Sequence, residues 1–124
     1  MNHILRDLTD VSAFVAARAQ QHERFPDPWA AREALDALAD QVEILIQRVP
    51  DYLDCSRSLV EDAHRLLIEA RVEVDGDRQA EMVPALLRVA DSRLLKAFHT
   101  LAAVQRATDA SMAQVLAAGR VGAA

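Results

Sequence analysis

The sequence predicts an all-α fold: an antiparallel up-down-up-down four-helix bundle with left-handed heptad packing, in which the fourth helix is the longest. Alanine fills 24 of the 124 positions, glycine only three, and β-branched residues are sparse, which is typical of helices. Apolar residues recur at alternating spacings of three and four, the pattern of one packed helical face. Short connections between segments of similar length make consecutive helices antiparallel. A rearranged three-helix core is the alternative.

The first predicted helix covers residues 4–23. Two prolines within residues 25–28 end it, because a proline lacks an N–H donor and disfavours helical geometry in the residue before it. Asp27 is then placed to cap the second helix, and Pro28 takes its first position, where a missing donor costs nothing. The apolar stripe of the first helix consists of Ile4, Leu8, Val11 and Val15, widened by Leu5 and Phe14.

The second and third predicted helices cover residues 28–49 and 51–73. Pro50 separates them, and Asp51 is available as a cap for the third. Asp75, Gly76 and Asp77 form a turn signal that ends the third helix. The second heptad seam runs through Ala31, Leu35, Leu38, Val42, Leu45 and Val49. The third runs through Leu53, Ser56, Val60, Ala63, Leu67, Ala70 and Val74, and only its serine is polar.

The fourth predicted helix covers residues 79–107 and completes a single domain of residues 1–107. A start under an Asp77 cap makes Pro84 break a backbone bond and kink the helix, whereas a start near Val83 needs no kink. We expect a loose first turn and then a regular helix. Residues 108–124 continue as a helical extension and flexible C-terminal tail, which overshoots the bundle before Gly119 and Gly122 end it. The seam runs through Val83, Leu87, Ala90, Leu94, Ala97, Leu101 and Val104.

Composition excludes several protein classes. The single cysteine, Cys55, allows no intramolecular disulfide and no paired-cysteine zinc or redox site. Charged residues interrupt the N-terminal segment before a signal peptide could develop, and uncharged runs are far shorter than the roughly 20 residues of a membrane span. We therefore expect a soluble, cytoplasmic protein with no membrane association. Arginine holds 13 of the 14 basic positions, which with the abundant alanine indicates a GC-rich, bacterial genome.

The formal net charge of −5 is unevenly distributed along the chain. Residues 25–49 carry −3 and residues 50–76 carry −4, whereas residues 77–107 carry +2. Acidic segments beside a basic fourth helix suggest that edge charges guide helix pairing, and recognition of a partner is the second interpretation. The acidic background and the lack of interleaved aromatic residues disfavour nucleic-acid binding.

One pair of residues has the spacing of a metal site. Glu61 and His64 lie three residues apart on the third predicted helix, as the ligands of carboxylate-bridged di-iron bundles do. Those bundles need a second such pair, but the residue three positions before His99 is Lys96. We therefore expect neither a metal site nor a cofactor, and interpret the pair as surface or edge residues.

Two further pairs suggest catalysis. An arginine separated by four to six residues from a histidine resembles the motif of HEPN-type ribonucleases, and Arg57 with His64 and Arg93 with His99 have this spacing. The resemblance implies RNA cleavage by two copies of the pair brought together in a dimer. Thirteen arginines and four histidines produce about as many matches by chance, so the motif assigns no catalytic residue.

The remaining candidates are apolar. Trp29, in the first turn of the second predicted helix, is expected to cover one end of the core, and if exposed it would anchor a partner. Met112, Val115 and Leu116 extend an apolar face beyond the bundle, unless the end frays and binds nothing. We therefore predict a non-enzymatic, adaptor-like interaction or regulatory module that acts through protein–protein association as a homodimer. A small helical enzyme, either a HEPN-like ribonuclease or a metal-dependent bundle, is the alternative.

Overall fold

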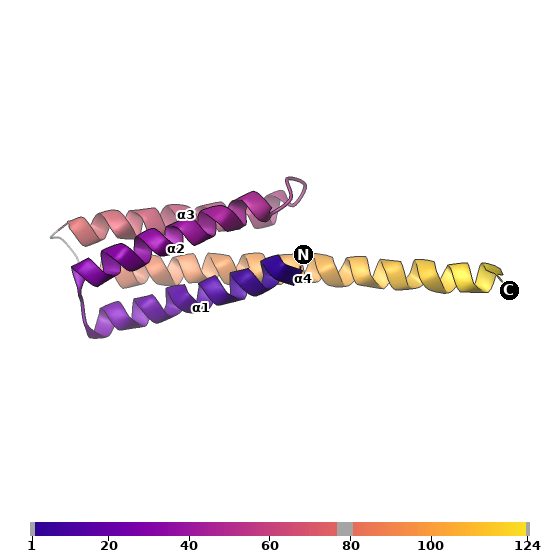
Figure 1. Cartoon of the computed structure of the whole chain (residues 1–124), viewed down its shortest axis with the longest axis horizontal. Coiled ribbons are helices and arrows are strands. Elements are labelled where there is room, and N and C mark those ends of the chain that lie inside the picture. Colours follow the sequence, from indigo (N-terminus) through magenta and orange to yellow (C-terminus); the bar gives the residue numbers. More distant parts are fainter. Residues whose placement is uncertain (1, 77–80, 124) are drawn as a thin grey trace.

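Four antiparallel helices surround one core in the computed structural model, which describes residues 2–76 and 81–123 (Figure 1). They are α1 (Asn2–Arg24), α2 (Pro28–Arg48), α3 (Asp54–Asp75) and α4 (Met82–Ala123). Helix α1 contacts α2 and α4, and α3 contacts the same two helices. The chain therefore runs up, down, up and down around a ring. This confirms the predicted four-helix bundle, including the greater length of α4.

The start of α2 follows the predicted capping. The carboxylate of Asp27 accepts hydrogen bonds from the backbone N–H groups of Trp29, at 3.1 Å, and Ala30, at 3.3 Å. Its carbonyl accepts the first intrahelical bond, from the N–H of Ala31 at 2.9 Å. Pro28 occupies the first turn, where its missing donor leaves no bond unmade.

The predicted Asp51 cap of α3 is wrong. The helix begins at Asp54 rather than at residue 51, and Leu53 occupies the N-cap position without a side-chain cap. Asp51 instead accepts a hydrogen bond from the guanidinium of Arg57. Asp51 lies three residues before α3 begins, whereas a side-chain cap comes from the residue directly before the helix, so its carboxylate is free to bind Arg57.

Pro84 causes no break in α4. Residues 77–80, which include the predicted Asp77 cap and the predicted start at residue 79, lie outside the described residues. From Met82 onward the chain is helical, and Pro84 falls within the first turn, whose N–H groups have no intrahelical partner. The N–H of Ala85 reaches the carbonyl of Glu81 at 3.5 Å directly after it. The proline therefore removes no hydrogen bond.

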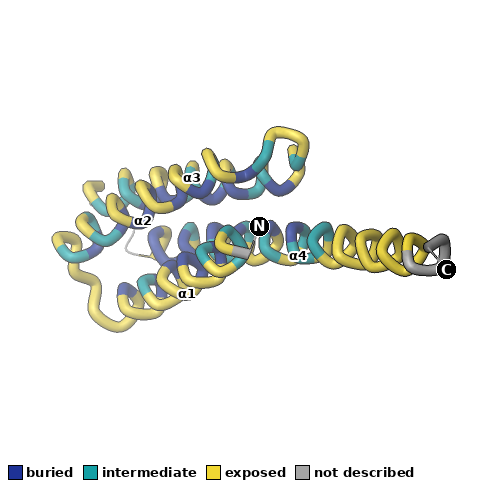
Figure 2. Tube along the Cα trace, turned by 45° about the vertical axis from the view of Figure 1, so that its right-hand side comes forward, coloured by how far each residue is buried: buried dark blue, intermediate teal, exposed yellow. Residues whose placement is uncertain are grey.

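Most residues of the predicted seams fill the core (Figure 2). Ile4, Leu53 and Val74 are only partly buried against it, and Val104 is half-buried beyond the last buried residue of α4. Ser56, the polar residue of the third seam, is buried with them. Phe14 differs from its prediction: it was expected to widen the apolar stripe of α1, and its side chain is 56% exposed. Each helix contributes at least one fully buried leucine, namely Leu8, Leu35, Leu67 and Leu94.

Ion pairs between helices differ from the pairing that net charge suggested. The basic helix α4 binds α1, where Arg88 lies 2.7 Å from Glu23, and no ion pair among the described residues joins α4 to acidic α3. The acidic helices α2 and α3 bind each other instead, since Arg71 of α3 lies 3.0 Å from Asp36 of α2. The position of each arginine on its helix, and not the net charge of the segment, therefore decides the pairing.

Helix α4 is longer than predicted. It passes through Gly119 and ends at Ala123, although glycine was expected to end it. At 1.5 Å per residue its 42 residues span about 63 Å, nearly twice the length of α1. Despite this length, neither α4 nor any other described helix carries an apolar stretch sufficient to cross a membrane.

Candidate functional site

The C-terminal part of α4 projects beyond the bundle as a single helix, and we call residues 106–123 the extension. It leaves the bundle at the end where α1 begins (Figure 1). Leu101 is the last buried residue described in α4, and every side chain from 106 to 119 is exposed (Figure 2). The extension is about 27 Å long. The side chains from 106 to 119 pack against no described part of the bundle, and helices in proteins gain most of their stability from packing of one face, so contacts with another chain would stabilise the extension.

The extension carries an apolar stripe on one side. Met112, Val115 and Leu116 are 57%, 66% and 58% exposed, and their spacing places them on one helical face. Met112 follows buried Leu94 by about five helical turns, so it lies on the same side of α4. The extension therefore continues the core-facing side of α4 into solvent.

Few charges accompany this stripe. Between residues 106 and 119 only Arg106 and Asp109 are charged. The carboxylate of Asp109 accepts a hydrogen bond from the side-chain amide of Gln105 at 2.9 Å. The remaining surface of this stretch is largely alanine, which allows another helix to approach closely.

Trp29 does not cover the core, so that expectation is wrong. Its side chain is 68% exposed, and neighbouring Phe25 is 76% exposed. The cause is its position in α2: the buried face begins at Ala31, and Trp29 lies about 200° around the helix from that residue. The two aromatic side chains form an exposed patch at the end of the bundle away from the extension.

The arginine that lies beside the Trp29 ring belongs to a network of ion pairs between α2 and α3. The guanidinium of Arg32 lies 5.7 Å from the centre of the Trp29 ring and 2.5 Å from a carboxylate oxygen of Asp75. Arg71 binds the same carboxylate at 2.6 Å and Asp36 at 3.0 Å. Hydrogen bonds from Arg71 and then from Arg32 lower the pKa of Asp75, and the bond to Asp75 raises the pKa of Arg71. The network orients Arg32 and leaves the tryptophan largely in water.

Replacing Trp29 by alanine should therefore lower the free energy of unfolding by less than about 1 kcal/mol, the value of an exposed cation–π contact. Equilibrium unfolding in urea, followed by far-UV circular dichroism, measures the change. A loss of about 3–5 kcal/mol, which is usual for a buried tryptophan, would contradict the exposed position.

A groove runs along the outer surface between α1 and α2, and we call it the α1–α2 groove. It consists of two hollows of about 240 and 350 Å³ that share Phe14 and Gln41. The sequence does not predict this groove, because an apolar stripe indicates which side of a helix is buried but not how far apart two helices lie. Alanines such as Ala34 and Ala37 provide too little volume to fill the seam. The apolar side chains along the groove are Val11, Phe14, Leu38, Ile44 and Leu45.

The residues proposed for metal binding do not form a metal site. Arg57, Glu61 and His64 lie at successive turns of α3, but Glu61 is 3.3 Å from the guanidinium of Arg57. Arg57 also binds Asp51, so two carboxylates offset its positive charge. Within residues 2–76 and 81–123, no group of three or more histidine, cysteine, aspartate or glutamate side chains is placed to hold a metal ion.

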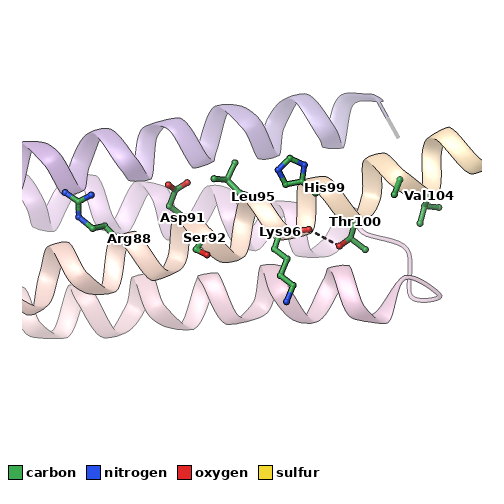
Figure 3. A pocket seen from close by; sticks show the side chains of 9 residues that line it. Arg88, Asp91, Ser92, Leu95, Lys96, His99, Thr100 and Val104 are labelled. Carbon is green, nitrogen blue, oxygen red and sulfur yellow. Dashed lines mark hydrogen bonds between the residues drawn. The ribbon is translucent and has the colours of Figure 1, made fainter.

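The other candidate catalytic pair, Arg93 and His99, lies on different sides of α4. His99 is exposed on α4, with its ring edge-on to Phe98 at 5.4 Å, and lines a shallow depression of about 780 Å³ (Figure 3). Arg93 does not line this depression and lies about 240° around α4 from His99. Lys96 lines the same depression one turn before His99, and Figure 3 shows the two side chains diverging from each other. Because α4 alone forms the depression, it is an open strip and not an enclosed pocket.

One further histidine is buried in the fold. His22 of α1 is only 6% exposed and lines a hollow of about 180 Å³ with Glu73 of α3. Burial, and to a lesser extent the positive charge of Arg18, lowers the pKa of His22 below its ordinary value of 6.5. The folded protein therefore binds a proton at His22 less readily than the unfolded chain does.

Acidification should destabilise the fold through His22. Below a pH of about 6.5 the unfolded chain binds more protons at this position than the folded chain, so the free energy of unfolding decreases as the pH falls. In urea unfolding at about pH 8 and about pH 5, H22Q should lose less stability on acidification than the unmodified chain. Replacement of the exposed His99 by glutamine is the matched control. Equal pH dependence in H22Q and the unmodified chain would contradict the assignment.

The chain has no match among protein-family models, curated proteins or solved structures. The extension carries three exposed apolar side chains on one helical face, and Phe14 and Ile44 are at least half exposed along the α1–α2 groove. These two surfaces are the candidate functional site.

Proposed function

We propose that this chain is a non-enzymatic, adaptor-like interaction module that associates with another protein chain through its extension. Its first partner is a second copy of itself. The observation that carries the proposal is a projecting helix of about 27 Å whose exposed stripe, Met112, Val115 and Leu116, continues the core-facing side of α4. An apolar face of this kind is typically covered by another helix.

Association has a clear source of free energy. Burying a side chain such as valine, leucine or methionine contributes about 1.5–3 kcal/mol. The three residues of the stripe are more than half exposed, so each supplies more than half of this in each chain, and a second helix also stabilises an extension that packs against no described part of its own bundle. Part of this gain offsets the entropy lost when two chains associate.

The chemistry of the extension favours a protein partner over other surfaces. Helices that lie on membranes carry many lysines and arginines on their polar face, and surfaces that bind nucleic acid need several cations for the phosphates. Between residues 106 and 119 the extension carries one arginine and one aspartate. A weakly charged helix with an apolar stripe matches the surface of another helix best.

The test is the absolute mass of the full chain by light scattering after size exclusion, beside that of a chain ending at Arg106. Both are measured over a hundredfold range of concentration, with a reductant because Cys55 is exposed. The full chain should be dimeric and the shortened chain monomeric. A full chain that stays monomeric throughout would overturn self-association, and a dimer that survives truncation would overturn the role of the extension.

Two point variants refine this test without shortening the chain. V115D places a carboxylate within the stripe, whereas Q114D places the same charge about 100° away around the helix. V115D should be monomeric at concentrations where Q114D and the unmodified chain are dimeric. Equal masses for the two variants would contradict a contact through the stripe.

A further inference from the structure

We propose that the α1–α2 groove is the surface that receives the extension of a second copy. Two chains would then exchange extensions across a two-fold axis. This inference rests on the proposed function and names the receptor for the extension.

The groove and the extension match in length and in chemistry. Along α1 the groove reaches from Asp7 to Gln21, about 21 Å, and the exposed stretch from 106 to 119 is about 20 Å long. Phe14 and Ile44 are 56% and 50% exposed along it. One helix laid in the groove would cover these side chains and its own stripe together.

The direction of the extension requires a second chain. It points away from its own bundle along the bundle axis, so it does not reach its own groove (Figure 1). It leaves from the end where α1 begins and α2 ends, and the groove extends toward that same end as far as Asp7 and Arg48, which lie 2.6 Å apart. A two-fold axis across this end directs each extension into the groove of the other copy. The assembly then closes at two chains, because both docking sites are occupied.

This arrangement predicts a register. An extension that enters at the open end runs parallel to α1 of the other copy, with Arg106 near the level of Asp7. Equal rise per residue then places residue 113 at the level of Phe14, so the stripe begins beside the exposed phenylalanine. The small side chain of Ala113 permits close approach of the two helices.

The two surfaces carry opposite net charges. Asp10 lines the groove, and Glu33 and Asp40 are exposed on α2 beside groove residues. None of these three carboxylates takes part in an ion pair among the described residues. Arg18 also lines the groove, so the surface keeps an excess of negative charge, whereas the extension carries a formal charge of +1. Opposite charges favour the pairing. They do not set the register, which places Asp109 at the level of Asp10.

The alternative partner of each extension is the extension of the other copy. A pair of extensions covers only the stripe and leaves Phe14 and Ile44 in solvent. Exchange covers the stripe and the groove of both chains in one dimer, so the groove is the favoured receptor for the extension.

Variants of two isoleucines test the groove. I44D introduces a carboxylate into it, and I68D introduces one on α3, where Ile68 has a similar exposure of 44%. I44D should raise the dissociation constant of the dimer at least about tenfold, because docking leaves the carboxylate unpaired in an apolar contact. I68D should stay within about twofold of the unmodified chain. Circular dichroism on dilute samples verifies that both variants fold.

Mixing two variants supplies the decisive measurement. An I44D homodimer has both grooves altered, and a V115D homodimer has both extensions altered. A mixed dimer keeps one intact contact, between the extension of the I44D chain and the groove of the V115D chain. Mass measurement with a tag on one chain should therefore detect a heterodimer at concentrations where each variant alone is monomeric.

The outcomes separate this inference from the proposed function. An I44D chain that dimerises as tightly as the unmodified chain, while V115D is monomeric, overturns the groove and leaves association through the extension. Failure of the mixture to form a heterodimer also overturns the exchange. An unmodified chain that never dimerises overturns both proposals.

Discussion

Replacing Leu94 by alanine should lower the free energy of unfolding by about 2–5 kcal/mol, the range for a fully buried leucine. Leu94 is 0% exposed and lies midway along the part of α4 that belongs to the bundle. The substitution removes contacts with the core and leaves a cavity that the surrounding helices fill only in part. Urea unfolding at one fixed protein concentration measures the loss, and the fixed concentration matters because association also adds to stability.

The adjacent residue supplies the control. Leu95 is 40% exposed, so L95A removes less buried surface and should cost less than about 1 kcal/mol. The two substitutions delete the same atoms from consecutive positions. Similar losses for both would mean that α4 presents a different face to the core.

Removing the hydroxyl of Ser12 should lower the free energy of unfolding by about 1.5–3 kcal/mol, the range for a hydrogen bond to a charged group. Ser12 is 5% exposed on α1 and donates a hydrogen bond to the carboxylate of Asp91 on α4. In S12A the partly buried carboxylate loses this donor and is left without the protein contact that offsets its desolvation. Urea unfolding of S12A measures the effect.

Ser92 is the matched control for this bond. It is exposed on α4 directly after Asp91, and S92A should change stability by no more than about 0.5 kcal/mol. If S12A is as stable as S92A, the bond between α1 and α4 contributes nothing in solution.

The extension illustrates how much of the candidate site the sequence predicts. Met112, Val115 and Leu116 were identified from their spacing and from their position beyond the length of the other helices. That inference works because helical spacing determines which side chains share a face. The α1–α2 groove could not be found in this way, because it depends on the distance between two helices and on the alanine side chains between them.

The aromatic residues show that helical spacing does not predict which residues at the edge of an apolar stripe are buried. Phe14 lies one position before the buried Val15, so it lies at the edge of the stripe of α1. Whether an edge residue is covered depends on the neighbouring helix, and α2 leaves Phe14 half in solvent. Trp29 follows the same rule at the end of α2, where no described helix covers it.

Local sequence determined the number of helices, their antiparallel order, the seams that form the core and the cap at Asp27, because each depends on backbone chemistry or on periodicity within one segment. Tertiary structure decided which charges pair between helices, as Arg88 with Glu23 and Arg71 with Asp36 show. It also decided which apolar edges stay exposed. These features depend on contacts between side chains of different helices, and the spacing of residues within a single helix does not determine those contacts.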